Sequence, residues 1–137
     1  MSFNTDSIGS QVYFVHGYCG NESQFYDMIN YLDNSELFNN QLNRTIEHLF
    51  FNFYEKYYNL GMTKTQIHNI QGGISTFALD FFEQLRQTHD SAEISIVAHS
   101  LGGLIVREML RNHRRELELS KITIIRVITL GTPHLGT

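Results

Sequence analysis

Short apolar runs and amphipathic segments alternate along this chain, and the alternation limits the folds open to it. Runs rich in β-branched and aromatic residues predict buried strands at residues 11–16, about 49–53, 93–100 and 121–133. Apolar residues at helical spacing predict helices between them, at about 24–32, 74–88 and 101–117. Alternation of this kind is typical of a parallel sheet, and near-continuous apolar strands are covered on both faces. We therefore expect an α/β fold in which a parallel sheet of about four strands has helices on both faces.

Details of three elements follow from the same pattern. The helix at 74–88 is expected to bury a stripe of five residues, Phe77, Leu79, Phe81, Phe82 and Leu85. Residues 59–70 are polar and predict an irregular segment. Arg126 places a charge inside the last apolar run, and this indicates either a β-bulge or a strand that begins only at Arg126.

Length and charge exclude several classes of protein. The chain has 137 residues, which is enough for one domain with a core, so residues 1–137 are expected to form a single domain. Acidic residues outnumber basic ones 14 to 10, and the net charge of −4 argues against nucleic-acid binding. The one basic cluster is predicted to be the solvated face of a helix rather than a phosphate or headgroup site; it comprises Arg107, Arg111, Arg114 and Arg115.

The sequence shows no sign of secretion or membrane insertion. A cationic start followed by an apolar run is absent, and no apolar stretch approaches the roughly 20 residues that span a bilayer. The one cysteine, Cys19, cannot form an intramolecular disulfide and is expected to be a small packing residue. These features predict a soluble, cytoplasmic protein.

Ser100 stands where a predicted strand turns directly into a predicted helix, in the segment ISIVAHSLGGLIVREML (residues 94–110). Ligands bind beyond the carboxyl ends of parallel strands, and Ser100 falls at such an end. A sharp strand-to-helix turn crowds the residues two positions before and after it, so both are small. Here they are Ala98 and Gly102, which is the spacing of the nucleophile elbow G-x-S-x-G with alanine in place of the first glycine.

Backbone N–H groups at the start of the following helix are free to bind a developing oxyanion. The N–H of Leu101 is predicted to be one such donor. A second donor usually comes from the loop after the first strand, which here reads His16-Gly17-Tyr18. Gly17 permits a turn that directs the N–H of Tyr18 inward, so Leu101 and Tyr18 are the predicted pair of oxyanion donors.

Three segments together resemble the lipase and esterase branch of the α/β-hydrolase superfamily: VYFVHGYCGNESQF, SIVAHSLGGLIVREML and VITLGTPHLGT. The segment FFNFYEKYYNLG with its following helix also resembles GPI inositol-deacylase-like serine esterases. The resemblance implies an incomplete α/β-hydrolase fold, a Ser-Asp/Glu-His triad in that chain order with Ser100 as nucleophile, and no metal or organic cofactor. In the family the acid and the histidine follow later strands. Both are therefore expected after Thr137, and the chain is interpreted as an amino-terminal portion of a longer hydrolase.

The histidines within the chain are weaker candidates for the base. His16 is expected to be structural, His99 to point away from the turn, and His134 to support its loop. Surface positions are predicted for the remaining four, His48, His68, His89 and His113.

The resemblance implies hydrolysis of a small-molecule or lipid ester through an acyl-enzyme. A thioesterase or an acyltransferase would use the same groups, and a hydrolase fold kept as a non-catalytic binding module is the alternative from another class. Peripheral membrane contact and the oligomeric state stay open.

Overall fold

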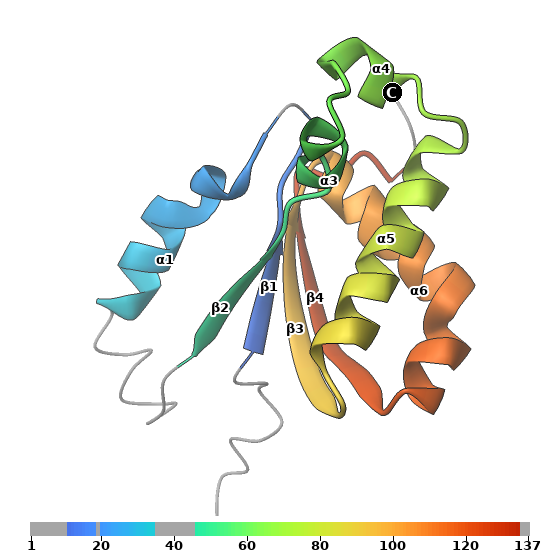
Figure 1. The fold of residues 1–137 in the computed structure, drawn as a ribbon. Coiled ribbons are helices and arrows are strands. Elements are labelled where there is room, and N and C mark those ends of the chain that lie inside the picture. The colour runs from blue at the N-terminus through green and yellow to red at the C-terminus, as the bar shows by residue number, and fades with distance from the viewer. Residues whose placement is uncertain (1–10, 19, 35–45, 135–137) are drawn as a thin grey trace, which may run out of the picture.

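A four-stranded parallel sheet forms the centre of the computed structural model, which describes residues 11–18, 20–34 and 46–134 (Figure 1). The strands are β1 (Gln11–Val15), β2 (Glu47–Phe51), β3 (Ala92–His99) and β4 (Ile122–Leu130). Their order across the sheet is β2-β1-β3-β4, and each neighbouring pair is parallel. This arrangement confirms the predicted α/β fold.

Helices cover both faces of this sheet. A 3₁₀ turn, η2 (Glu22–Phe25), leads into α1 (Tyr26–Asp33), which lies on one face. The other face is covered by α5 (Gly73–Thr88) and α6 (Leu101–Leu119), which run side by side (Figure 1). These elements confirm the three predicted helices within a few residues.

The segment predicted to be irregular contains regular structure, so that prediction was wrong. Two short helices, α3 (Glu55–Asn59) and α4 (Lys64–His68), connect β2 to α5. Thr63 and Gln66 form a reciprocal capping box at the start of α4, because each side chain bonds the other residue's backbone N–H. Figure 1 shows α3 and α4 beyond the carboxyl ends of the strands. These helices therefore lie at the end of the sheet where ligands bind.

Side chains alternate between the two faces of β1 and so divide the core. Tyr13 and Val15 join the larger cluster with residues of β3, α5 and α6. Phe14 faces the opposite way and packs on Phe25, with ring centroids 5.1 Å apart, and on Ile29 of α1. Both faces of the central strand are therefore buried, which explains its continuous apolar sequence.

The last strand contains the bulge that Arg126 suggested. Ile94 of β3 pairs with Ile124, but Ser95 pairs with Arg126, so Ile125 is the extra residue. The strand begins well before it, at Ile122. Of the two predicted alternatives, the bulge is confirmed.

One residue of the predicted α5 stripe was assigned to the wrong face. Leu79 is 45% exposed, whereas Ala78 is fully buried. Successive helical residues are separated by about 100°, which groups Ala78 with Phe77, Phe81 and Leu85 and turns Leu79 away. The predicted solvated face of α6 is confirmed, since Arg107, Arg111, Arg114 and Arg115 are all exposed. Cys19 lies outside the described residues.

Candidate functional site

Ser100 occupies a single-residue turn between β3 and α6. Its backbone has φ 52° and ψ −120°, a conformation that residues other than glycine seldom adopt. Two contacts from the end of β4 hold it there: the Ser100 N–H donates to the Leu130 carbonyl at 2.9 Å, and the Thr132 hydroxyl donates to the Ser100 carbonyl at 3.0 Å. Ser100 is half-buried, and its own hydroxyl bonds to none of the described residues.

The small residues on either side of this turn permit close packing. A methyl group placed on Gly102 would lie 2.4 Å from the His16 carbonyl oxygen and 2.6 Å from that of Val15. Only glycine therefore allows the first turn of α6 to approach the end of β1. Ala98 is fully buried, with Val15 and Thr129 as its register partners on the two neighbouring strands.

The loop after β1 lies against the same turn. A methyl group on Gly17 would lie 3.1 Å from the Ser100 Cβ and 2.8 Å from Nδ1 of His99. Because β1 and β3 are adjacent and parallel, the two segments meet although they are far apart in sequence. The structure thus brings together the His-Gly loop and the Ser100 turn.

Three hydrogen bonds fix the conformation of this loop. The Gly17 N–H donates to Oε1 of Gln24 at 3.1 Å, and the Gly17 carbonyl accepts from the Gly20 N–H at 3.0 Å. The ring of His16 also bonds the Gly17 carbonyl, at 2.9 Å, so Nδ1 carries the proton. The Tyr18 N–H has no acceptor among the described residues. Sequence reasoning missed Gln24, because no residue pattern relates its side chain to the loop.

His16 is a buried part of the scaffold. Its side chain is 1% exposed and stacks on Phe53 with ring centroids 4.1 Å apart. Burial lowers the pKa of His16 below its usual range, and the hydrogen bond to the Gly17 carbonyl only partly opposes this. His16 therefore stays neutral at physiological pH.

The aromatic ring of Tyr18 is 61% exposed and rests on α4. It stacks on His68 with centroids 4.7 Å apart, and the phenolic oxygen lies 3.4 Å from Nδ1 of His68. His68 also contacts Tyr54 edge-on at 5.6 Å. The unpredicted helix α4 thus supports the loop that carries Tyr18.

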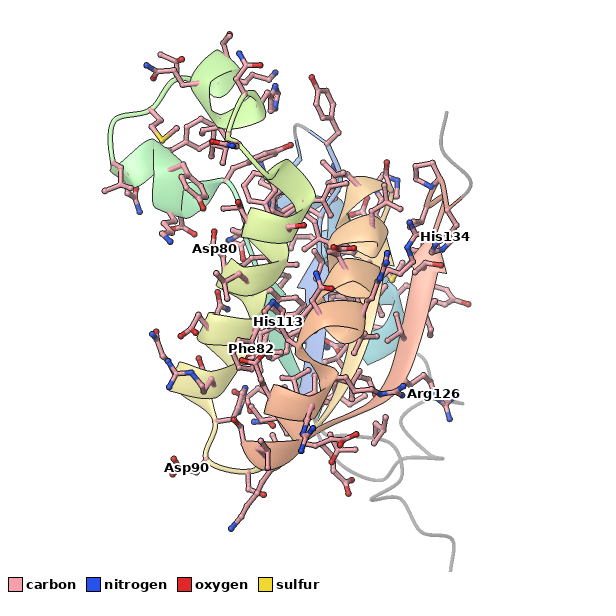
Figure 2. The ribbon with its side chains drawn as sticks, turned by 90° about the vertical axis from the view of Figure 1, so that its right-hand side faces the viewer. Asp80, Phe82, Asp90, His113, Arg126 and His134 are labelled. Carbon is pink, nitrogen blue, oxygen red and sulfur yellow. The ribbon has the colours of Figure 1, made fainter. Side chains whose placement is uncertain are left out.

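His134 lies at the end of β4, near the start of α6 (Figure 2). Arg107 donates to its carbonyl oxygen at 2.9 Å and lies 3.3 Å from its Nδ1. The other ring nitrogen lies 3.4 Å from the Thr129 hydroxyl. These contacts tie the ring to α6 and to the end of β4.

The four histidines predicted at the surface are partly exposed, and each of their rings also contacts an aromatic ring. His113 stacks on Phe82 between α6 and α5, with centroids 5.0 Å apart (Figure 2). His89 lies 2.8 Å from the Tyr13 hydroxyl. The remaining two are His48, which contacts Phe14, and His68. Ring stacking explains their partial burial, because each imidazole covers an apolar aromatic face.

The described residues contain no group of three or more His, Cys, Asp or Glu side chains placed to hold a metal ion. They also contain no helix that combines the length and the apolar character needed to cross a membrane.

The parallel sheet and the serine at a strand-to-helix turn define an α/β protein with a candidate nucleophile site. Comparison with protein families identifies the group to which it belongs. Residues 11–137 match the family described as "Putative serine esterase (DUF676)", and the chain is a member of that family. No curated protein and no solved structure matches the chain.

Proposed function

We propose that this protein is a serine ester hydrolase in which Ser100 is the nucleophile. The observation that carries the proposal is the backbone of Ser100, held at φ 52° between β3 and α6 and packed against Gly17. Strain of this kind persists only where surrounding contacts over-determine it, and it is common at catalytic residues. Ala98 and Gly102 are the small elbow residues that let the turn close.

Two backbone N–H groups are proposed to hold the oxyanion. Leu101 opens α6, a helix of 19 residues, where amide groups are free and the helix dipole is positive. In the facing loop, Gln24 already occupies the Gly17 N–H, which leaves Tyr18 as the available donor. Leu101 and Tyr18 therefore provide the pair that stabilises a tetrahedral intermediate.

The general base is proposed to lie outside the described residues. Ser100 forms no hydrogen bond with any described histidine, and the ring of His134 is bonded by Arg107 and Thr129. We expect a histidine and an acid that follow Thr137 to complete a Ser-Asp/Glu-His triad. His99 lies beside Gly17 but is not assigned this role, because it precedes Ser100 directly and forms no hydrogen bond with it.

The reaction proceeds through a covalent acyl-enzyme. Ser100 Oγ forms a bond to the carbonyl carbon of the ester, the base takes the hydroxyl proton, and the carbonyl oxygen becomes the oxyanion. Collapse breaks the bond to the alcohol, which leaves with that proton. Water then attacks the acyl carbon and gives a proton to the base. The bond to Ser100 Oγ breaks, the carboxylic acid leaves, and Oγ takes the proton from the base.

The resemblance to lipases and esterases favours lipid or acyl esters as substrates, and a relation to GPI inositol-deacylase-like esterases is the finer expectation. A thioesterase or an acyltransferase would share every step except the group that leaves or accepts the acyl chain. A non-catalytic binding module is the competing function.

Labelling with a fluorophosphonate tests the proposal, because this probe reacts with an activated serine. We expect labelling of the natural full-length protein, loss of labelling in Ser100→Ala, and retention in Ser120→Ala, a matched change at the far end of α6. His99→Asn and His134→Asn should still label. Absence of labelling from the folded full-length protein would overturn the proposal in favour of the binding module.

A further inference from the structure

A pocket of about 310 Å³ opens beside the loop that follows β1. His16 and Gly20 of that loop form one side, and η2 and α3 contribute the others. The pocket therefore lies at the carboxyl ends of β1 and β2, and its lining residue His16 directly precedes Gly17, which packs against Ser100.

The charged groups among the described lining residues are both negative. Glu22 and Glu55 supply two carboxylates, and no lysine or arginine is among the described lining residues. Lys56 is adjacent to Glu55 in sequence, but its amine bonds Asp80 of α5 at 3.1 Å. His16 contributes no positive charge, because burial keeps it neutral.

Asn52 adds an unsatisfied acceptor to this wall. Its Nδ2 donates to Glu55 at 3.4 Å, and its Oδ1 is covered by protein without a hydrogen-bond partner. The orientation is fixed by chemistry, since a carboxylate only accepts and must face the amide N–H₂. No donor among the described residues bonds Oδ1, so its partial negative charge adds to the potential of the two carboxylates.

Tyrosine rings form the remaining walls. Tyr54 is buried against His16, with ring centroids 5.3 Å apart, and Tyr58 lies 6.2 Å from Tyr54. On the other side Tyr26 is 47% exposed. Aromatic faces attract cations through their quadrupole, and the attraction grows where water is partly excluded.

We propose that this pocket binds a positively charged nitrogen, an ammonium group carried by the ester substrate close to its scissile bond. The inference rests on the proposed function of Ser100 and names the substrate class: esters of amino alcohols or of cationic acyl groups. Carboxylates attract the charge, tyrosine rings surround it, and the adjacent loop places the ester carbonyl near Ser100.

Three esters with the same acyl chain test the inference. Their alcohols are choline, ethanolamine and 3,3-dimethylbutanol, the last being the uncharged isostere of choline. We expect kcat/KM for the cationic esters to exceed that of the isostere by about tenfold at low ionic strength, and the preference to shrink as salt screens the carboxylates. A choline preference over ethanolamine would assign recognition to the rings, and the reverse would assign it to hydrogen-bond acceptors.

Variants locate the preference within the pocket. The double change Glu22→Gln and Glu55→Gln should bring the ratio of cationic to neutral ester close to one. Glu93→Gln and Glu118→Gln, two exposed carboxylates outside the pocket with the same change in charge, should retain it. Tyr58→Leu should lower the ratio, and Tyr58→Phe, which keeps the ring, should not. Equal kcat/KM for all three esters, or a preference that survives in the pocket double variant, would overturn the inference.

A binding measurement separates this inference from the proposed function. Titration with tetramethylammonium, followed by tyrosine fluorescence, needs no turnover. Saturable quenching is expected in the unmodified protein and in the Glu93/Glu118 control, and it should be lost in the Glu22/Glu55 variant. Quenching without fluorophosphonate labelling would retain the cation site and refute the esterase. Labelling without quenching would retain the esterase and refute the cation site.

Discussion

The substitution Gly102→Ala directly tests the close contact between the start of α6 and the end of β1. Glycine inside a helix normally destabilises it, and replacement by alanine contributes about 1 kcal/mol of stability where nothing opposes the methyl group. At Gly102 the methyl carbon would lie 2.4 Å from the His16 carbonyl oxygen, whereas ordinary contact begins at 3.4 Å. The start of α6 and the end of β1 would therefore have to separate by about 1 Å.

Neither obstacle can rotate out of the way, because both are backbone carbonyl groups, of His16 and Val15. Overpacking of a tight core typically costs about 1–3 kcal/mol, and we expect Gly102→Ala to lose stability in that range despite the helix gain. The shift also moves the proposed oxyanion donors relative to Ser100, and a misplacement of about 1 Å slows chemistry by roughly a hundredfold. Fluorophosphonate labelling should slow by a comparable factor.

Urea unfolding and the labelling rate measure both effects, with Gly103→Ala as the comparison. A methyl group on Gly103 would meet the Thr132 side chain, 2.0 Å away at the closest atom, and a side chain can move. Thr132→Ala should therefore reduce the cost of Gly103→Ala but not that of Gly102→Ala. If Gly102→Ala were more stable than the unmodified protein and labelled at the same rate, the close approach of α6 to β1 would be refuted.

Three further predictions concern the loop after β1. Gln24→Leu removes the acceptor of the Gly17 N–H and should slow labelling of the folded protein about tenfold, because one hydrogen bond of roughly 1–1.5 kcal/mol is lost. Gln24→Glu keeps an acceptor and should label at a nearly normal rate. Because burial lowers the pKa of His16, the unfolded chain takes up a proton first as pH falls. The stability that neutral His16 contributes is complete above the usual pKa of about 6.5, and it is lost below that pH by at most about 1.4 kcal/mol per pH unit. Between pH 7.5 and 5.5 the urea midpoint should therefore fall less in His16→Asn than in the unmodified protein. An equal fall in both proteins would contradict the assignment. His68→Ala should slow labelling by releasing the Tyr18 ring, and His68→Phe should retain the rate. Equal rates in the unmodified protein and both variants would refute a role for α4 in supporting Tyr18.

Periodicity and strand adjacency explain why so much of the fold could be predicted from sequence. The apolar runs at 93–100 and 121–133 do form parallel strands, and β3 buries Ile94, Ile96 and Ala98. The expected burial on both faces was wrong for β4, because β4 is the edge strand of the described sheet and most of it is exposed, which apolar composition alone does not reveal. Arg126 marked the bulge because a charge inside such a run needs a route to solvent, and the structure gives it an exposed position. The turn at Ser100 could be predicted because a sharp strand-to-helix turn needs small residues at fixed spacing.

Features built from distant side chains could not be predicted in this way. Glu22, Asn52 and Tyr58 line one pocket, yet they come from three separate elements or loops and no spacing relates them. The support that His68 gives to Tyr18 is similarly invisible in sequence. Helix α4 could have been predicted, because the capping box between Thr63 and Gln66 is a local sequence signal. The polar composition of the segment obscured that signal.

The most direct test of the central claim is the position of the acyl group in a trapped intermediate. The full-length protein would be incubated with p-nitrophenyl acetate, quenched in acid during the initial burst, digested and mapped by mass spectrometry. We predict one acetyl group per molecule on Ser100 in the folded protein, and none at that residue after denaturation. Acetylation spread over exposed nucleophiles such as Ser91 and Lys121 at similar levels, with Ser100 unmodified, would contradict the account.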